Sequence, residues 1–283
     1  FVRIIGTVKE YGYVPESGQY YPDSYGKNLK EVINLGSNNW EKLDYAFKYT
    51  DSLNRFNIHH SDTSSVKSMK GMFYYTNANN LDDVNLMNTK NVTDMSNMFG
   101  FATRITNLDL SNFVTGKVTD MSYMFYRTYS LLSLDISNFN TSNVTSMDNM
   151  FALATRITNL DLSSFDTFNV VDMGGMFTYV GYFTTPLEKL DLSHFDFSNL
   201  EAADSMFIYS KIENIDLSNK FAPKLTNVRN MFKSCSELKN LSLHSFVTKD
   251  IRYASSLFDG SSSLYSLDLS SWKFSNNYRD VKK

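Results

Sequence analysis

The sequence predicts an α/β repeat solenoid, in which one short parallel strand and one short helix form each turn of about 26 residues. Three observations lead to this prediction. A Met-Phe pair recurs at nearly constant spacing, an apolar pattern typical of a strand recurs with the same period, and an apolar pattern typical of a short helix lies between them. A strand and a helix of this size cannot bury their apolar sides alone, whereas stacked copies cover one another.

The Met-Phe pairs define the period. Successive pairs are separated by 26, 26, 26, 26, 30 and 25 residues, and a Leu-Phe pair follows 26 residues later. Ala46-Phe47 lies 26 residues before the first pair and marks a degenerate copy. About eight or nine turns are therefore expected. The pairs are Met72-Phe73, Met98-Phe99, Met124-Phe125, Met150-Phe151, Met176-Phe177, Met206-Phe207 and Met231-Phe232, followed by Leu257-Phe258.

The strand of each unit is predicted by the pattern L-x-x-L-x-L-x-x-F. In one copy its apolar positions are Ile105, Leu108, Leu110 and Phe113. The letters NLDLS within this copy alternate apolar and polar residues, which is typical of a strand with one buried face. The copy near Leu81 is irregular.

The helix of each unit is predicted by the pattern V-x-x-M-x-x-M-F. Val92, Met95, Met98 and Phe99 show the spacing i, i+3, i+6 and i+7, which forms a stripe along one side of a short helix. One strand and one helix in each turn follow the leucine-rich repeat plan. The single 30-residue interval predicts that four extra residues, within 178–189, bulge from the loop between helix and strand.

Two segments are distinguished along the chain. Residues 1–40 do not fit the repeat, and their stretch YGYVPESGQYYPDSYG is interpreted as an N-terminal cap or the end of a preceding module. Residues 41–283 are assigned to the solenoid, whose last copy stops in the middle of a unit. We therefore expect that the natural chain continues or that a partner covers this edge.

Composition excludes several classes of function. The chain has 283 residues, of which 42% are hydrophobic, and a formal net charge of −3, so a large core is expected and a nucleic-acid partner is not. No apolar run approaches the roughly 18–20 residues that span a bilayer, so membrane attachment would need an anchor outside this chain. The four histidines do not cluster at ligand spacing, Cys235 is interpreted as a core residue, and no catalytic residue, metal or cofactor is predicted.

The segment LDISNFNTSNVTSMDNMF, residues 134–151, resembles the repeat of BspA-like leucine-rich repeat surface proteins. It is most similar to the subgroup found in mycoplasmas and in some lactobacilli and listeriae, and the resemblance covers roughly residues 41–280. The resemblance implies an extracellular, lipid-anchored or wall-anchored protein on a bacterial cell, with adhesion to host matrix proteins or other cells as its role. It supplies no catalytic residues.

A column of aspartates forms the first candidate binding surface. In a parallel sheet, equivalent residues of successive turns lie about 4.8 Å apart, so these carboxylates repel one another unless something offsets the charge. The column serves either as a cation site or acidic docking face, or as a set of acceptors for neighbouring Ser, Asn and backbone groups. Its members are Asp109, Asp135, Asp161, Asp191, Asp216 and Asp268.

The variable loops after each Met-Phe pair form the second candidate surface. They are rich in aromatic residues, which are enriched at protein interfaces. These side chains either anchor a partner or pack within their own loops. The candidates are Tyr126, Tyr129, Tyr179, Tyr182, Phe183 and Tyr209.

The leading hypothesis is a non-enzymatic, adhesin-type binding module that contacts a protein or glycan on host or neighbouring cells through the solenoid face and the variable loops. The alternative is a structural subunit that self-associates through the solenoid ends into a filament or surface layer. The mass in solution discriminates between them, since an adhesin is expected to be monomeric and the subunit to form polymers.

Overall fold

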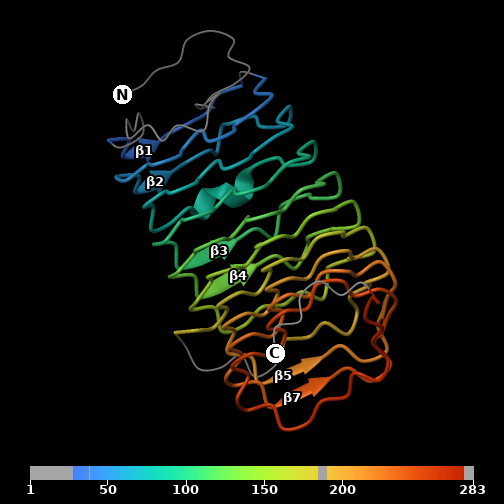
Figure 1. The fold of residues 1–283 in the computed structure, drawn as a ribbon. Helices are drawn as coiled ribbons and strands as arrows, with labels where there is room; N and C mark the ends of the chain where they lie inside the picture. The colour runs from blue at the N-terminus through green and yellow to red at the C-terminus, as the bar shows by residue number, and fades with distance from the viewer. Residues whose placement is uncertain (1–27, 38, 184–189, 277–283) are drawn as a thin grey trace.

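The computed structural model describes residues 28–37, 39–183 and 190–276. The chain forms a solenoid whose coils stack one on another from the N-terminal to the C-terminal end (Figure 1). The predicted repeat solenoid is therefore confirmed. Most of the segment 1–40, part of the insertion at 178–189 and the last residues of the chain lie outside the described residues.

Parallel backbone pairing sets the length of each coil. Isolated bridges join equivalent residues of successive coils, and the paired positions are spaced by 26, 30, 25 or 26 residues in the same order as the Met-Phe pairs. The predicted period and the place of the longer coil are thereby confirmed. The bridge column consists of Lys42, Ser68, Asp94, Asp120, Ser146, Asp172, Ala202, Asn227 and Tyr253.

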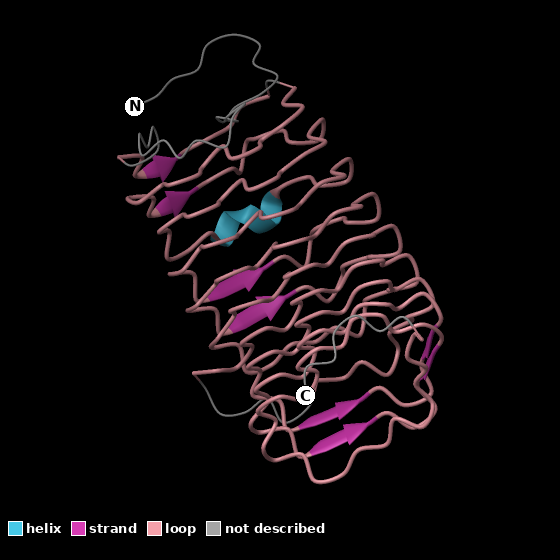
Figure 2. Cartoon of the chain, viewed as in Figure 1, coloured by secondary structure: helices cyan, strands magenta, loops and turns pink. Residues whose placement is uncertain are grey.

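A second parallel ladder carries the named strands, which are short and pair in twos (Figure 2). In β3, Leu108 is buried between the exposed Asn107 and Asp109, as the alternating pattern predicted. The pairs are β1 (Glu31–Val32) with β2 (Arg55–Phe56), β3 (Asn107–Asp109) with β4 (Ser133–Asp135), and β5 (Asn214–Asp216) with β7 (Asn240–Ser242). A further pair, β6 (Phe221–Ala222) with β8 (Val247–Thr248), lies in the corner that follows the strand.

The predicted helix in each coil is wrong. Among the described residues the only helical element is the 3-10 helix η1 (Asp82–Leu86), which lies in the irregular copy and not in a Met-Phe segment (Figure 2). The N–H groups of Met98 and Gly100 donate to carbonyls three residues earlier, at 3.2 and 2.9 Å, and form consecutive turns. The intervening N–H groups of Asn97 and Phe99 donate to carbonyls of the next coil, at 2.8 and 2.9 Å.

Left-handed backbone conformations explain this difference. Asn97 and Phe101 have φ angles of 58° and 59°, and both occupy the third position of a hydrogen-bonded turn, where a type II turn requires positive φ. A continuous right-handed helix cannot include such residues. Each of these turns begins two to four residues after the one before it, and together they bury Met95, Met98 and Phe99. Two turns of a helix would bury the same residues, so the apolar pattern does not distinguish a helix from consecutive turns.

The phenylalanine of each Met-Phe pair forms the centre of the core. From Phe47 to Phe258 the rings of successive coils stack, with centroid distances of 5.4–6.0 Å. Offset stacking of this kind contributes beyond the burial of apolar area. Each coil is thus packed mainly against the coil before it and the coil after it.

A column of buried threonines joins the coils at one corner. Thr141 Oγ1 donates to the Asp166 carbonyl at 2.7 Å and accepts the Asp166 N–H at 2.8 Å. The same pair of hydrogen bonds recurs along the column and satisfies backbone groups that would otherwise lack partners. The sequence analysis missed this feature, although a Thr two residues after the Phe of the strand pattern was its signal. The column consists of Thr63, Thr89, Thr115, Thr141 and Thr167.

Candidate functional site

The strand-side aspartate column, Asp109, Asp135, Asp161, Asp191, Asp216 and Asp268, lies exposed along the strand ladder. Each carboxylate accepts the N–H of the serine two residues later, at 2.8–3.1 Å. The hydroxyls of Ser111 and Ser137 also donate to their aspartates, at 2.7 Å. The predicted local hydrogen bonding is confirmed, and each aspartate stabilises the turn that ends its own strand segment.

These hydrogen bonds also set the ionisation of the column. The side chain and backbone of Ser137 lower the pKa of Asp135, and the serines two residues later lower the pKa of Asp161, Asp216 and Asp268 in the same way. These four carboxylates are therefore held in their charged form by donors of their own coil. Among the described residues, no group of His, Cys, Asp or Glu is arranged to hold a metal ion. A role of the column in docking stays a prediction.

A second group of carboxylates, which the sequence analysis missed, lies on the bridge ladder. Asp148, Asp172 and Asp204 surround Gly174, and a methyl group placed on Gly174 would lie 3.1–3.4 Å from one oxygen of each. Burial raises the pKa of Asp148 and Asp204, and the charge of Asp172 adds to the increase. We call this group the bridge-side aspartate cluster. Its signal was an acidic residue within the Met-Phe segments of three successive coils, which had been interpreted as helices.

The aromatic candidates near the insertion lie together. Tyr179 stacks on Tyr209 with a centroid distance of 4.6 Å and meets Tyr182 edge to face at 5.1 Å. Tyr182 in turn contacts Phe183 at 5.2 Å, and Lys211 Nζ lies 5.5 Å from the Tyr182 ring. Phe183 is 70% exposed. These five residues form the insertion corner, a continuous aromatic surface drawn from two coils.

The remaining aromatic candidates lie at the same corner of earlier coils. Tyr126 meets Phe101 edge to face at 5.2 Å, and the Arg127 guanidinium lies 4.9 Å from the Phe101 ring. Phe101 stacks on Tyr75 at 4.0 Å, so the ring contacts extend across three coils. Tyr129 is half-buried, and its carbonyl accepts the Thr155 hydroxyl at 3.5 Å. The sequence analysis missed Tyr75 and Phe101, which occupy the position two residues after each Met-Phe pair.

Cys235 is a core residue, as predicted. It is fully buried, and its thiol donates to the Phe207 carbonyl at 3.0 Å. Burial raises its pKa to about 11, so the thiolate required for nucleophilic attack is not formed at neutral pH.

Parallel coils with a shared phenylalanine core and varied corners define a repeat protein of the solenoid class. The chain belongs to the family described as "Mycoplasma protein of unknown function, DUF285", whose profile matches residues 41–133, 106–220 and 188–282. The mycoplasma-type repeat inferred from the sequence is therefore confirmed. No curated protein matches the chain. In the part of the chain that the structure describes, there is no helix with the length and apolar character needed to cross a bilayer.

Proposed function

We propose that the chain is a non-enzymatic, adhesin-type binding module on a bacterial cell surface, related to BspA-like leucine-rich repeat surface proteins. In this proposal it contacts a protein or glycan of a host or neighbouring cell over an extended surface. The solenoid provides a rigid framework on which side chains of successive coils are presented side by side.

The insertion corner is the observation that carries this proposal. Tyr179, Tyr182 and Tyr209 are held by ring contacts, and Phe183 projects from them with 70% of its surface exposed. Aromatic residues that are ordered before binding lose little conformational entropy on association, and such residues dominate the affinity of many interfaces. The longer coil therefore presents an exposed ring, Phe183, beside the ordered tyrosines of this corner.

The proposal is tested by screening the purified chain against immobilised host matrix proteins and glycans. Changing Tyr182 and Phe183 to Ala together should weaken binding to any ligand found by at least about tenfold. Tyr265→Ala is the matched control, because Tyr265 is 97% exposed and lies on the last coil, away from this corner. Equal loss in the control, or no loss in the double variant, would contradict a role of the insertion corner.

Self-assembly through the solenoid ends is the second candidate. At the last described coil, Leu267 and Phe274 are each 42% exposed. Apolar side chains exposed at the end of a stack of parallel coils can pack against another coil. Light scattering over a concentration series separates the two functions: a constant mass near 32.5 kDa supports the binding module, and a mass that grows with concentration supports assembly.

A further inference from the structure

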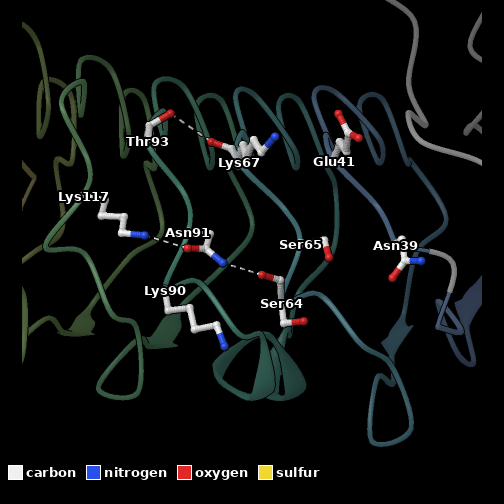
Figure 3. Close-up of a pocket in the computed structure, with 9 residues that line it drawn as sticks. All are labelled: Asn39, Glu41, Ser64, Ser65, Lys67, Lys90, Asn91, Thr93 and Lys117. Atoms are coloured by element: carbon white, nitrogen blue, oxygen red, sulfur yellow. Dashed lines mark hydrogen bonds between the residues drawn. The ribbon is translucent and has the colours of Figure 1, made fainter.

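A shallow basin lies at another corner of the N-terminal coils (Figure 3). Its lining residues precede the bridge column in the chain, whereas the aromatic corners follow it. The basin has a volume of about 650 Å³ and is open to solvent. It is lined by Asn39, Glu41, Ser64, Ser65, Lys67, Lys90, Asn91, Thr93 and Lys117.

The charge of the basin is opposite to that of the whole chain. Lys67, Lys90 and Lys117 come from three successive coils, whereas Glu41 is the only acidic residue among the described residues of the lining. The formal charge of these described residues is therefore +2 (three lysines and one glutamate), while that of the chain is −3. Within the described part of the chain, no ion pair joins these lysines to a carboxylate. None of the three ammonium groups is therefore neutralised by a direct ion pair, although the charge of Lys90 also acts on the Asp62 carboxylate.

Hydrogen bonds between coils hold the polar groups of the basin in place. Lys117 Nζ donates to Asn91 Oδ1 at 2.7 Å, and Asn91 Nδ2 donates to the Ser64 carbonyl at 2.8 Å. Thr93 Oγ1 donates to the Lys67 carbonyl at 3.1 Å. Because successive coils lie about 4.8 Å apart, the backbones of the first and third of these coils are offset by about 10 Å along the solenoid. Figure 3 shows the lysines and amides along this surface.

We propose that this basin binds a linear anionic polysaccharide, whose sulfate or carboxylate groups contact the three lysines. Its hydroxyls would exchange hydrogen bonds with the Ser, Thr and Asn side chains of the lining. This inference goes beyond the binding role proposed above, because it assigns a ligand class to a different surface. A shallow, open surface lined by lysine, hydroxyl and amide side chains from successive coils suits an extended chain better than a compact ligand, which needs an enclosed pocket.

The composition of the lining favours a polysaccharide over a nucleic acid. Proteins that bind single-stranded nucleic acid combine a positive groove with aromatic side chains on which bases stack. The described residues that line the basin include no aromatic side chain. Cationic groups beside hydroxyl and amide groups instead match a polymer that carries both anions and hydroxyls.

Dextran sulfate, with neutral dextran of the same length as reference, is the probe that tests this proposal. The wild-type chain should bind dextran sulfate and not dextran, and the affinity should fall as salt screens the exposed charges. Changing Lys67, Lys90 and Lys117 together to Gln should weaken binding at least about tenfold without changing the thermal midpoint. Binding that is equal for the wild type and the triple variant would overturn the proposal.

Lys224→Gln is the matched control. Lys224 Nζ donates to Asn199 Oδ1 at 2.7 Å, the same contact that Lys117 makes with Asn91, but it lies outside the basin. The affinity of this variant for dextran sulfate should equal that of the wild type, whereas Lys117→Gln alone should lower it. An equal loss in the two single variants would mean that any surface lysine suffices and would overturn the site.

Two further measurements separate this inference from other possibilities. A single-stranded DNA oligonucleotide of the same charge should bind more weakly than dextran sulfate, and tighter binding through the same lysines would replace the polysaccharide by a nucleic acid. The Tyr182 and Phe183 double variant should keep its affinity for dextran sulfate. The proposed role of the insertion corner and the proposed role of the basin can therefore be disproved independently of each other.

Discussion

The two aspartate groups of this protein lie in the same coils and behave in opposite ways. The strand-side column is exposed, and its carboxylates are hydrogen-bonded to serines two residues later, so the pKa values of Asp135 and Asp161 are lowered. In the bridge-side cluster, Asp148 and Asp204 are half-buried beside Asp172, and their pKa values are raised. Ionised aspartate is thus favoured on the strand ladder and disfavoured on the bridge ladder.

The difference shows how a stacked repeat treats charge. A column of like charges is tolerated where each charge has a donor in its own coil and water around it. Where residues of successive coils converge over a glycine and lose water, the charge is disfavoured even though amides offset part of the cost. Asn149 and Asn227 supply such amides, at 2.7 and 2.8 Å from Asp148 and Asp204. One coil contains Asp135, Thr141 and Asp148, so it can test both groups.

Thr141→Val should have the largest effect. Thr141 lies between Asp135 and Asp148 in the chain, and its hydroxyl joins their coil to the next through two hydrogen bonds. The valine fills the same volume but removes the partner that Thr141 supplies to both the N–H and the carbonyl of Asp166. We expect the free energy of unfolding in urea to fall by about 3 kcal/mol.

Thr145→Val is the control for this change. Thr145 is exposed and donates one hydrogen bond to the Thr119 carbonyl at 3.1 Å. Its replacement should cost less than about 1 kcal/mol. Equal costs would show that the threonine column is not what connects the coils.

Gly174→Ala should destabilise the bridge-side cluster next most strongly. The added methyl group meets three carboxylate oxygens at 3.1–3.4 Å, which is closer than an ordinary van der Waals contact. We expect a loss of about 2 kcal/mol in urea unfolding. Gly116→Ala, whose methyl group meets only Asn140, at 3.3 Å or more, should leave the stability within about 0.5 kcal/mol. If Gly174→Ala left the free energy of unfolding unchanged, the three carboxylates would be able to move apart without loss of stability.

Asp135→Ala should destabilise the strand side. It removes the acceptor of the Ser137 N–H and hydroxyl, at 3.1 and 2.7 Å. Because the site is exposed, we expect a loss of only about 1 kcal/mol. Asp135→Asn, which keeps an acceptor oxygen for the turn, should retain most of the stability. A gain in stability in Asp135→Ala would place this residue with the bridge-side cluster and break the comparison.

Asp148→Asn should have the opposite sign and the smallest size. A neutral amide removes the cost of ionising a half-buried carboxyl beside Asp172, so the unfolding free energy at neutral pH should rise by up to about 1 kcal/mol after allowance for solvent screening. A loss of stability here would show that the charge is needed by its neighbours.

The pH dependence of these two variants sharpens the contrast. Because the native pKa of Asp148 is raised, the native state binds more protons between the two pKa values, and stability falls as pH rises through this window. The advantage of Asp148→Asn should therefore vanish as pH falls through the native pKa. For Asp135 the native pKa is lowered, so its contribution is present at neutral pH and is lost as pH falls through that value. Urea unfolding at several pH values checks both directions.

Much of the architecture could be predicted from the sequence. The spacing of the Met-Phe pairs defined the coil length and the position of the longer coil, and the bridges have the same spacing. The alternation around Leu108 and Leu110 identified the buried residues of the strand ladder. These predictions are reliable because each coil contacts only its neighbours. A residue type that recurs at the same position of each coil therefore has the same surroundings in each coil.

The backbone between the strands could not be predicted in the same way. The spacing of Met95, Met98 and Phe99 suits a helix as well as it suits consecutive turns. The choice between them depends on where each N–H finds its acceptor, and in the structure alternate N–H groups bind the next coil. This acceptor exists only once the coils are stacked, so no local pattern could reveal it.

The sequence by itself determined the period, the solenoid and the identity of the buried side chains, because these follow from apolar residues repeated at a fixed distance. Only the tertiary structure decided which polar residues of different coils meet. Asp148, Asp172 and Asp204 converge over Gly174, and Lys67, Lys90 and Lys117 line one basin. The physical reason is that the register of the parallel coils brings together residues that are some 25 positions apart in the chain. These contacts change the charge and the solvent exposure around each residue, and local backbone preferences do not determine them.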